Sequence, residues 1–192
     1  MSYAPLIVEL LDAPAAECAP RLLGWTLLHM GVGGRIVEVE AYDGDEASHA
    51  FRGRTGRNGS MFAKAGSLYV YRSYGVHWCA NLACGPVGHG AAVLVRALEP
   101  TNGLEQMRER RRVTDDRLLC SGPGRLTEAL GITSDHDGLR ADVAPFALRP
   151  PAKPAVYDAT PRVGISKAAG LPWRFVERGS RWLSRGPRPS SP

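Results

Sequence analysis

Residues 35–42, with the sequence RIVEVEAY, place two glutamates two positions apart in a run of β-branched and apolar residues. Such residues are favoured in strands, so this run predicts a strand. Side chains two apart along a strand point to the same face, and Glu38, Glu40 and Tyr42 therefore share one side of the sheet. The alternation alone does not decide which of the two acids does chemistry.

Other strands are predicted from alternating or continuously apolar segments on both sides of this run. They are expected at residues 25–29, 67–75, 76–84, 90–100 and 172–178. A glycine turn at 31–34 joins the first of them to residues 35–42. The two adjacent segments predict a β-hairpin with Tyr74 and Gly75 near its tip.

Short helices are predicted at residues 12–24, 102–112 and 121–132. Asp12 is expected to cap the first, and Thr101 or Asn102 the second, because short polar side chains accept hydrogen bonds from the free amides at helix starts. Together these elements predict a single mixed α/β domain, of the α+β type, around a curved and mostly antiparallel sheet. The domain is expected to span residues 1–185, followed by a disordered tail at 186–192.

The composition is that of a moderately basic globular chain. It has 192 residues, a hydrophobic content of 44% and a formal net charge of +5. This length fits one domain, and the charge is compatible with a polyanionic partner without proving one. Four scattered cysteines argue against a disulfide scaffold, and the longest N-terminal apolar stretch is short and broken by glycine. We therefore expect a cytoplasmic protein with no membrane span.

Arg96 lies inside the apolar run at 90–100, where an arginine is costly to bury unless it is paired with a carboxylate or faces a polar site. Glu38 and Glu40 are the nearest partners in composition. A structural salt bridge is one interpretation. The other is a water-activating site, in which the arginine holds water and carboxylate in geometry. The sequence pattern leaves both open.

Several aromatic residues accompany this charged face. Tyr74, at the hairpin tip, has little core to join, so it is either a turn-packing residue or a wedge that inserts between stacked rings. Tyr42 and His49 follow the strand at 35–42 and could stack on a planar ligand, although a lone histidine is more often structural.

Three other motifs give weaker signals. His77, Cys79, Cys84 and Cys120 lack the spacing of a standard zinc site, so no metal site is predicted. The basic run at 108–112 is interpreted as the solvated end of a helix. Residues 121–124 (SGPG) precede a helix whose free amides could bind one phosphate, but they lack the spacing and the lysine of a nucleotide-binding P-loop.

Six stretches together resemble the alkyladenine DNA glycosylase family, also called 3-methyladenine DNA glycosylases. They are RIVEVEAY (35–42), SHAFRGRTGRNGSMF (48–62), LYVYRSYGVHWCANL (68–82), VLVRALEP (93–100), CSGPGRLTEALGI (120–132) and FVERGSRW (175–182). They occur in the order and approximate spacing of the family. The resemblance covers about residues 22–183, nearly the whole chain.

This resemblance implies a single mixed domain around a curved antiparallel sheet, with a β-hairpin that enters the minor groove of DNA. The implied activity is that of a monofunctional glycosylase in base-excision repair. It would flip an alkylated or deaminated purine, such as 3-methyladenine, 7-methylguanine, hypoxanthine or ethenoadenine, out of duplex DNA. It would then hydrolyse the N-glycosidic bond with an activated water and leave an abasic site. The implied protein is a nucleoid-associated bacterial monomer that binds damaged double-stranded DNA and needs no metal or organic cofactor.

The resemblance also implies roles for individual residues. Glu40 matches the general base, Arg96 the arginine that positions the water, and Tyr74 the residue that fills the gap in the base stack. The walls and floor of the base pocket match Tyr42, His49, Tyr71 and Asn81, of which Asn81 is implicated in rejecting purines with a 2-amino group. Contacts to the DNA backbone are expected from Lys64, Ser121, Gly122 and Arg125. Glu38 is left with a supporting role.

Two alternatives remain to be weighed. A lyase would need an amine nucleophile, and the only lysines are Lys64, Lys153 and Lys167. A non-catalytic nucleic-acid-binding module of related fold would need a basic surface but neither Glu40 nor Arg96.

Overall fold

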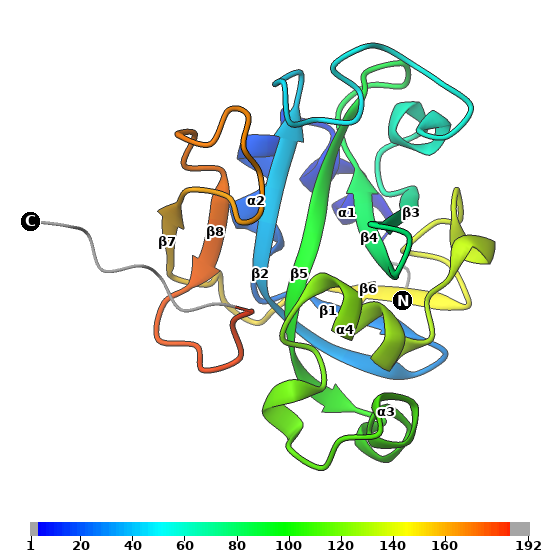
Figure 1. Ribbon diagram of the computed structural model, residues 1–192, viewed down its shortest axis with the longest axis vertical. Coiled ribbons are helices and arrows are strands. Elements are labelled where there is room, and N and C mark those ends of the chain that lie inside the picture. The colour runs from blue at the N-terminus through cyan, green and yellow to red at the C-terminus, as the bar shows by residue number, and fades with distance from the viewer. Residues whose placement is uncertain (1–3, 185–192) are drawn as a thin grey trace, which may run out of the picture.

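Eight antiparallel strands form one curled sheet in the computed structural model, which describes residues 4–184 (Figure 1). The strands are β1 (Thr26–His29), β2 (Val32–Asp43), β3 (Leu68–Ser73), β4 (His77–Ala83), β5 (Ala91–Asn102), β6 (Phe146–Arg149), β7 (Tyr157–Thr160) and β8 (Arg174–Glu177). Their order is β3-β4-β5-β2-β1-β6, and β8 pairs with both β2 and β7. The predicted α+β domain with a curved antiparallel sheet is confirmed, while the predicted tail at 186–192 lies outside the described residues.

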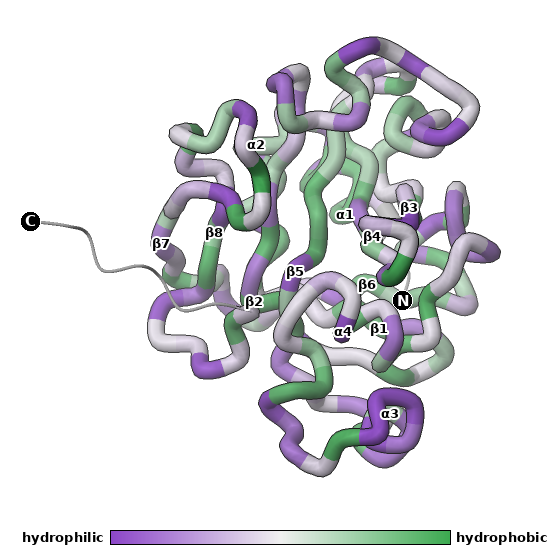
Figure 2. The backbone as a smooth tube through the Cα atoms, viewed as in Figure 1, coloured by the Kyte–Doolittle hydropathy of each residue, from purple (hydrophilic) through white to green (hydrophobic). Residues whose placement is uncertain are grey.

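The helices are α1 (Ala4–Leu11), α2 (Ala15–Leu22), α3 (Leu104–Arg111) and α4 (Pro123–Leu130), with short 3-10 turns at Gly59–Phe62, Asp116–Leu118 and Ser134–His136. Helix α2 packs on β2, and α4 packs on β4 and β5. Helix α3 is mostly hydrophilic, as its colour in Figure 2 shows. It buries Met107 alone among its residues. None of the helices in residues 4–184 is long and apolar enough to cross a membrane.

The expected helix caps are wrong. Pro14 precedes α2 and no side chain caps it, so Asp12 does not serve as the cap. Helix α3 follows Gly103, whose left-handed φ of 70° starts the helix without a side-chain cap from Thr101 or Asn102. Helix α1 was not expected, because its residues are apolar without a polar start signal.

The two long strands β2 and β5 lie side by side in the middle of the molecule (Figure 1). Strand β2 contains the predicted strand at 35–42 and begins three residues earlier. The chain turns at Met30 and Gly31, where φ is 50° and 80°, a conformation that suits a tight hairpin. The predicted glycine turn at 31–34 is therefore only partly right.

Gly33 and Gly34 are strand residues at a close approach of backbones. A Cβ at Gly33 would lie 2.0 Å from the carbonyl oxygen of Leu27, and one at Gly34 would lie 1.9 Å from that of Glu99. Glycine is required at both positions because each neighbouring atom belongs to a paired backbone.

Paired irregularities interrupt the β2–β5 ladder beside the two glutamates. Ile36 faces Leu98, Glu38 faces Ala97, and the next pair is Val39 with Val95. Val37 on β2 and Arg96 on β5 are thus left without a direct partner. Bulges of this kind re-aim side chains next to functional sites. Arg96 occupies such a position.

The alternation of β2 separates an apolar face from a charged one. Val39 and Ala41 join the main apolar core, together with Val93 and Val95 of β5. Glu38 and Glu40 point to the opposite face, as the sequence pattern predicts. Strand β8 pairs with β2 at these residues, so the two acids lie between β5 and β8.

The buried His29, on β1, is expected to make the free energy of unfolding depend on pH in mild acid. It is 5% exposed, and its Nδ1 atom lies 2.8 Å from the carbonyl oxygen of Leu130. Burial, with smaller contributions from the facing His136 and Arg110, lowers the pKa of His29 below its ordinary 6.5. Below that pH the unfolded chain binds a proton that the folded chain excludes.

We therefore expect the free energy of unfolding to fall as the pH is lowered from 6.5 through the folded pKa. The slope of this fall should not exceed that produced by the uptake of one proton. Urea unfolding between pH 7 and 5 measures this. His29→Gln keeps a donor for Leu130 but cannot titrate, so its unfolding should depend less on pH over this range. An equal dependence in the variant would show that His29 is not the titrating group.

Candidate active site

A cavity of about 470 Å³ opens beside the charged face of β2, a volume in the usual range for small-molecule pockets. It is lined by six of the residues that the sequence singled out: Tyr42, His49, Tyr71, Tyr74, Asn81 and Arg96. These come from β2, the long loop after it, the β3–β4 pair and β5. The fold therefore gathers them from distant parts of the chain into one site.

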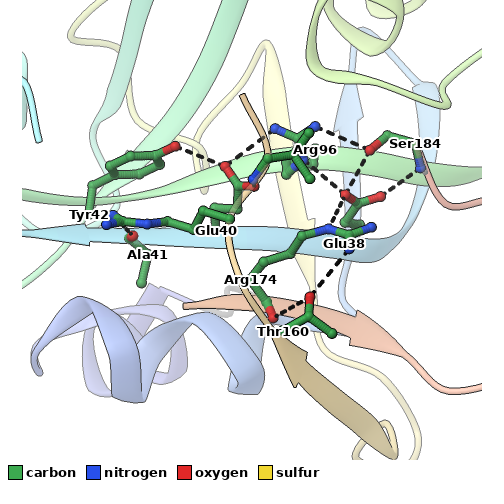
Figure 3. A network of polar contacts seen from close by, with 10 residues as sticks. Glu38, Glu40, Ala41, Tyr42, Arg96, Thr160, Arg174 and Ser184 are labelled. Carbon is green, nitrogen blue, oxygen red and sulfur yellow. Dashed lines mark hydrogen bonds and ion pairs between the residues drawn. The ribbon is translucent and has the colours of Figure 1, made fainter. Parts of the chain in front are cut away.

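Glu40 is fully buried and does not itself line the cavity, but it is hydrogen-bonded to three residues that do, and both of its carboxylate oxygens are engaged (Figure 3). The Oε2 atom accepts hydrogen bonds from the Tyr42 hydroxyl at 2.9 Å and from Arg96 Nη1 at 3.3 Å. The Oε1 atom accepts from the backbone amide of Val163 at 2.7 Å. A carboxylate has about four acceptor positions, so Oε1 retains capacity for a further donor.

Glu38, beside Glu40 on β2, binds a second set of donors (Figure 3). Its Oε1 atom accepts from Arg96 Nε at 2.9 Å and Arg174 Nε at 2.8 Å, and it is also bonded to the Ser184 hydroxyl. Burial opposes its charge, but the two arginines outweigh burial and hold the pKa of Glu38 below its ordinary value. Glu38 is therefore a buried anion.

Arg96 connects the two acids. Burial favours the neutral form of its guanidinium, but Glu40 and Glu38 overcome this and raise the pKa of Arg96. Arg96 therefore makes the buried ion pairs of the first interpretation, and it also lines the cavity; its role in activating water stays a prediction.

Three rings pack together along one side of the cavity. The Tyr69 and Tyr71 rings, which lie two apart on β3, are stacked with centroids 5.4 Å apart. His49 meets Tyr71 edge-on at 4.5 Å, and its Nδ1 lies 2.9 Å from the Tyr69 hydroxyl. Burial, assisted by Arg57, lowers the pKa of His49, which favours a neutral imidazole. Tyr69 is a residue that the sequence reading did not assign to the site.

Tyr42 also lines the cavity. Burial and the neighbouring Glu40 raise its pKa, so its hydroxyl stays protonated and donates to the carboxylate. The guanidinium of Arg162 lies over the Tyr42 ring at 4.7 Å. Tyr42 is therefore held between a carboxylate at its hydroxyl and a buried cation over its ring.

Asn81 and Tyr74 occupy contrasting positions. Asn81 is 4% exposed and donates from Nδ2 to the Tyr69 carbonyl at 2.9 Å. Tyr74 is 91% exposed, in the link between the paired strands β3 and β4, with a left-handed φ of 49°. A bulky residue with positive φ is uncommon and carries local strain. Tyr74 thus presents its ring to solvent at the cavity rim.

Sequence reasoning missed Arg162 and its partners. The Arg162 side chain is fully buried, binds both carboxylate oxygens of Asp45 at 2.7 and 3.0 Å, and donates to the Ala41 carbonyl at 2.9 Å. It therefore fixes the start of the loop that carries His49, and the next residue, Val163, bonds to Glu40. The residues around Arg162 follow neither a helical nor a strand period. The one available signal was a lone arginine in a segment with no predicted helix.

The four residues expected to contact the DNA backbone do not all lie near the cavity. Ser121 and Gly122 lead into α4, whose first residue, Pro123, lines the cavity, and Arg125 donates to the Ser121 hydroxyl at 2.9 Å. Lys64 is exposed but does not line the cavity. The exposed Arg57 and Arg72, which were not assigned, do line it.

The weaker motifs have separate surroundings. No group of three or more histidine, cysteine, aspartate or glutamate residues within 4–184 is arranged to hold a metal ion. All four cysteines are buried and free, and Cys79 alone among them lines the cavity. In the basic run, Arg108 pairs with Asp116 and Arg111 with Glu128, so the helix end is partly neutralised.

Comparison with known proteins gives consistent matches along the chain. A family model described as Methylpurine-DNA glycosylase (MPG) matches residues 9–181. A protein of Nitrosospira multiformis is 56% identical over 175 residues, 91% of each chain. One of Rhodopseudomonas palustris is 56% identical over 170 residues, 88% of this chain and 85% of its own. One of Granulibacter bethesdensis is 53% identical over 176 residues, which are 89% of this chain and 83% of its own. All three bear the provisional name 3-methyladenine DNA glycosylase.

Proposed function

Because this chain belongs to the methylpurine-DNA glycosylase family, we propose that it excises damaged purines from duplex DNA by hydrolysing the N-glycosidic bond. The observation that carries the proposal is the buried Glu40–Arg96 pair beside a cavity with aromatic walls. The substrates are purines that are alkylated or deaminated: 3-methyladenine, 7-methylguanine, hypoxanthine and ethenoadenine.

The cavity supports recognition of a flipped base. Its volume suits a planar heterocycle, and Tyr42 and Tyr71 offer ring faces on which an electron-poor base stacks. Flipping costs a few kcal/mol and costs least for a damaged or mispaired base. In this proposal Asn81, whose Nδ2 donates to the Tyr69 carbonyl, forms the floor of the pocket and excludes a 2-amino group.

Glu40 and Arg96 perform the proposed chemistry. As the C1′–N bond breaks, its electron pair leaves with the purine and positive charge develops on the sugar. The Glu40 carboxylate stabilises this charge and accepts a proton from the water that attacks C1′. Arg96 holds the carboxylate in place at 3.3 Å, and Val163 orients the other oxygen.

The proposed reaction leaves an abasic site in an intact strand. A lyase step would require an amine at C1′. Lys64, Lys153 and Lys167 are absent from the cavity lining, which supports hydrolysis by water. The proposed binding-only alternative has no corresponding support, because it leaves a buried pair of acids and an arginine beside the cavity without a role.

The DNA surface proposed here is the cavity rim. Arg57, Arg72 and Arg125 are exposed on three different segments, and the first two line the cavity. Arginine contacts with phosphates release counterions, so binding should weaken steeply as salt increases.

A base-release panel tests the proposed function. Duplexes that each contain one of the four lesions, or undamaged adenine or guanine, are incubated with enzyme, and the released base and the strand are analysed separately. Release of at least one damaged purine from an unbroken strand is expected. No release from any of the duplexes, under conditions where they are bound, would contradict the proposal.

Tyr74→Ala is expected to reduce lesion binding and excision by about 10-fold or more, since the side chain would no longer fill the gap left by the flipped base. The stability of the protein should change by less than about 0.5 kcal/mol, because the side chain is exposed. Binding is measured with lesion duplexes and stability by urea unfolding. Tyr74→Phe, which retains the ring, is the matched control. Equal activity of the alanine variant would exclude the wedge role.

A further inference from the structure

Ser184 lies in the charged network even though it is 146 residues from Glu38 in the chain (Figure 3). Its backbone amide donates to Glu38 Oε2 at 2.6 Å. Its hydroxyl donates to Glu38 Oε1 at 2.7 Å. The same hydroxyl oxygen accepts a hydrogen bond from Arg96 Nη2 at 3.2 Å.

The Ser184 hydroxyl can donate one hydrogen bond and accept another at the same time. A serine hydroxyl has one proton to donate and lone pairs to accept with. Its proton is directed to Glu38, so its oxygen faces Arg96 as an acceptor. This is a combined role that neither an alanine nor a second carboxylate can fill.

Ser184 also completes the coordination of Arg96. The Nε atom of Arg96 binds Glu38, Nη1 binds Glu40, and Nη2 binds Ser184. A planar guanidinium held at all three nitrogens cannot rotate about its own axis without breaking a bond. Because Nη1 is the atom that reaches Glu40, fixing the other two nitrogens also fixes that contact.

We propose that Ser184 is a positioning residue for the reaction: by holding Glu38 and Arg96 together, it aligns the guanidinium with the Glu40 carboxylate. The inference rests on the proposed function for its kinetic consequence. Its structural content, that Ser184 restrains Arg96, holds independently of the substrate. The segment that follows β8 is thereby part of the active site.

Ser184→Ala tests the inference in the full-length protein. Excision is measured under single-turnover conditions, and binding is measured with a lesion duplex whose glycosidic bond resists cleavage. We expect the excision rate to fall about 10- to 100-fold, since small displacements of a positioning group have effects of this size. The affinity for DNA should stay within about 2-fold, because Ser184 is not a residue of the cavity lining.

Two variants control this measurement. Ser184→Thr retains the hydroxyl, and since Ser184 is only partly buried its added methyl group has room; activity should return to within a few-fold of the unmodified protein. Ser180→Ala removes a hydroxyl from the same segment, where it accepts from the Trp182 amide at 3.3 Å, and should leave excision unchanged. An excision rate in Ser184→Ala equal to that of the unmodified protein would overturn the inference, as would a parallel loss of binding and folding.

Nuclear magnetic resonance of arginine side chains gives a readout that does not depend on activity. In protein labelled with ¹⁵N-arginine, the restrained Nη groups of Arg96 should give separate, slowly exchanging signals that are retained in Ser184→Thr and averaged in Ser184→Ala. Unchanged signals in Ser184→Ala would refute the restraint itself. If the unmodified protein released no damaged base while these signals behaved as expected, the proposed function would fail and the restraint of Arg96 would stand.

Discussion

Replacing Glu40 with glutamine is expected to slow excision by about 10²- to 10⁴-fold, the usual contribution of a general base. Glutamine is nearly the same size and can still accept the hydrogen bond that the Val163 amide donates to Glu40 Oε1. It can neither take a proton from water nor stabilise a developing positive charge. Single-turnover excision measures the chemical step, and binding to a cleavage-resistant lesion duplex should be retained.

Glu99→Gln is a matched control for this experiment. Glu99 lies on β5 like Arg96, but its carboxylate is 30% exposed and pairs with Arg35 away from the cavity. Its replacement should leave excision within about 2-fold of the original rate, since the surface pair contributes little. Full activity of Glu40→Gln would remove Glu40 from the mechanism and leave Glu38 as the remaining buried acid.

Glu38→Gln is expected to produce the largest loss of stability, about 3–5 kcal/mol, because removal of one partner leaves buried charge uncompensated. Glu38 is fully buried and bonds to Arg96 and Arg174. Urea unfolding measures the loss, and Glu99→Gln should change the free energy of unfolding by less than about 1 kcal/mol. Excision per folded molecule should fall far less than in Glu40→Gln. The reverse order of the two activities would mean that the roles of the acids are exchanged.

Glu38 should also make the stability of the protein depend on pH, and the direction of this dependence follows from its pKa. The pKa of Glu38 is lower in the folded chain than its ordinary value of 4.5. The stabilisation from Glu38 is therefore complete above that pH and is lost as the pH falls through the folded pKa. Below pH 4.5 the unmodified protein should lose stability more steeply than Glu38→Gln does.

The strands that build the site could be predicted because their patterns are local. Alternation in residues 37–42 placed the two acids on one face, and an apolar run around Arg96 required a partner for that arginine. No sequence pattern indicates the register irregularity at Arg96. It depends on the fit of β2 to β5, which only the assembled sheet determines.

The supporting residues could not be predicted for a different reason. Arg162 is 117 residues from Asp45, and Ser184 is 146 residues from Glu38. Contacts over such separations carry no period in the sequence. The short strands β6 and β7 were missed because each has only four residues and lies outside the long alternating segments. The helix caps were mispredicted because backbone conformation at Pro14 and Gly103, not a polar side chain, begins those helices.

The separation between Glu38 and Ser184 also has a consequence for biosynthesis. The chain is made from its N-terminus, so β2 leaves the ribosome long before Arg174 and Ser184 exist. Until then Glu38 lacks its partners Arg174 and Ser184, and Arg96 lacks Ser184. Contacts of high sequence separation form late and slow folding. Completion of the Glu38–Arg96 network is thus coupled to completion of the chain, and a truncated nascent protein would carry Glu40 without the restrained arginine that we propose aligns it.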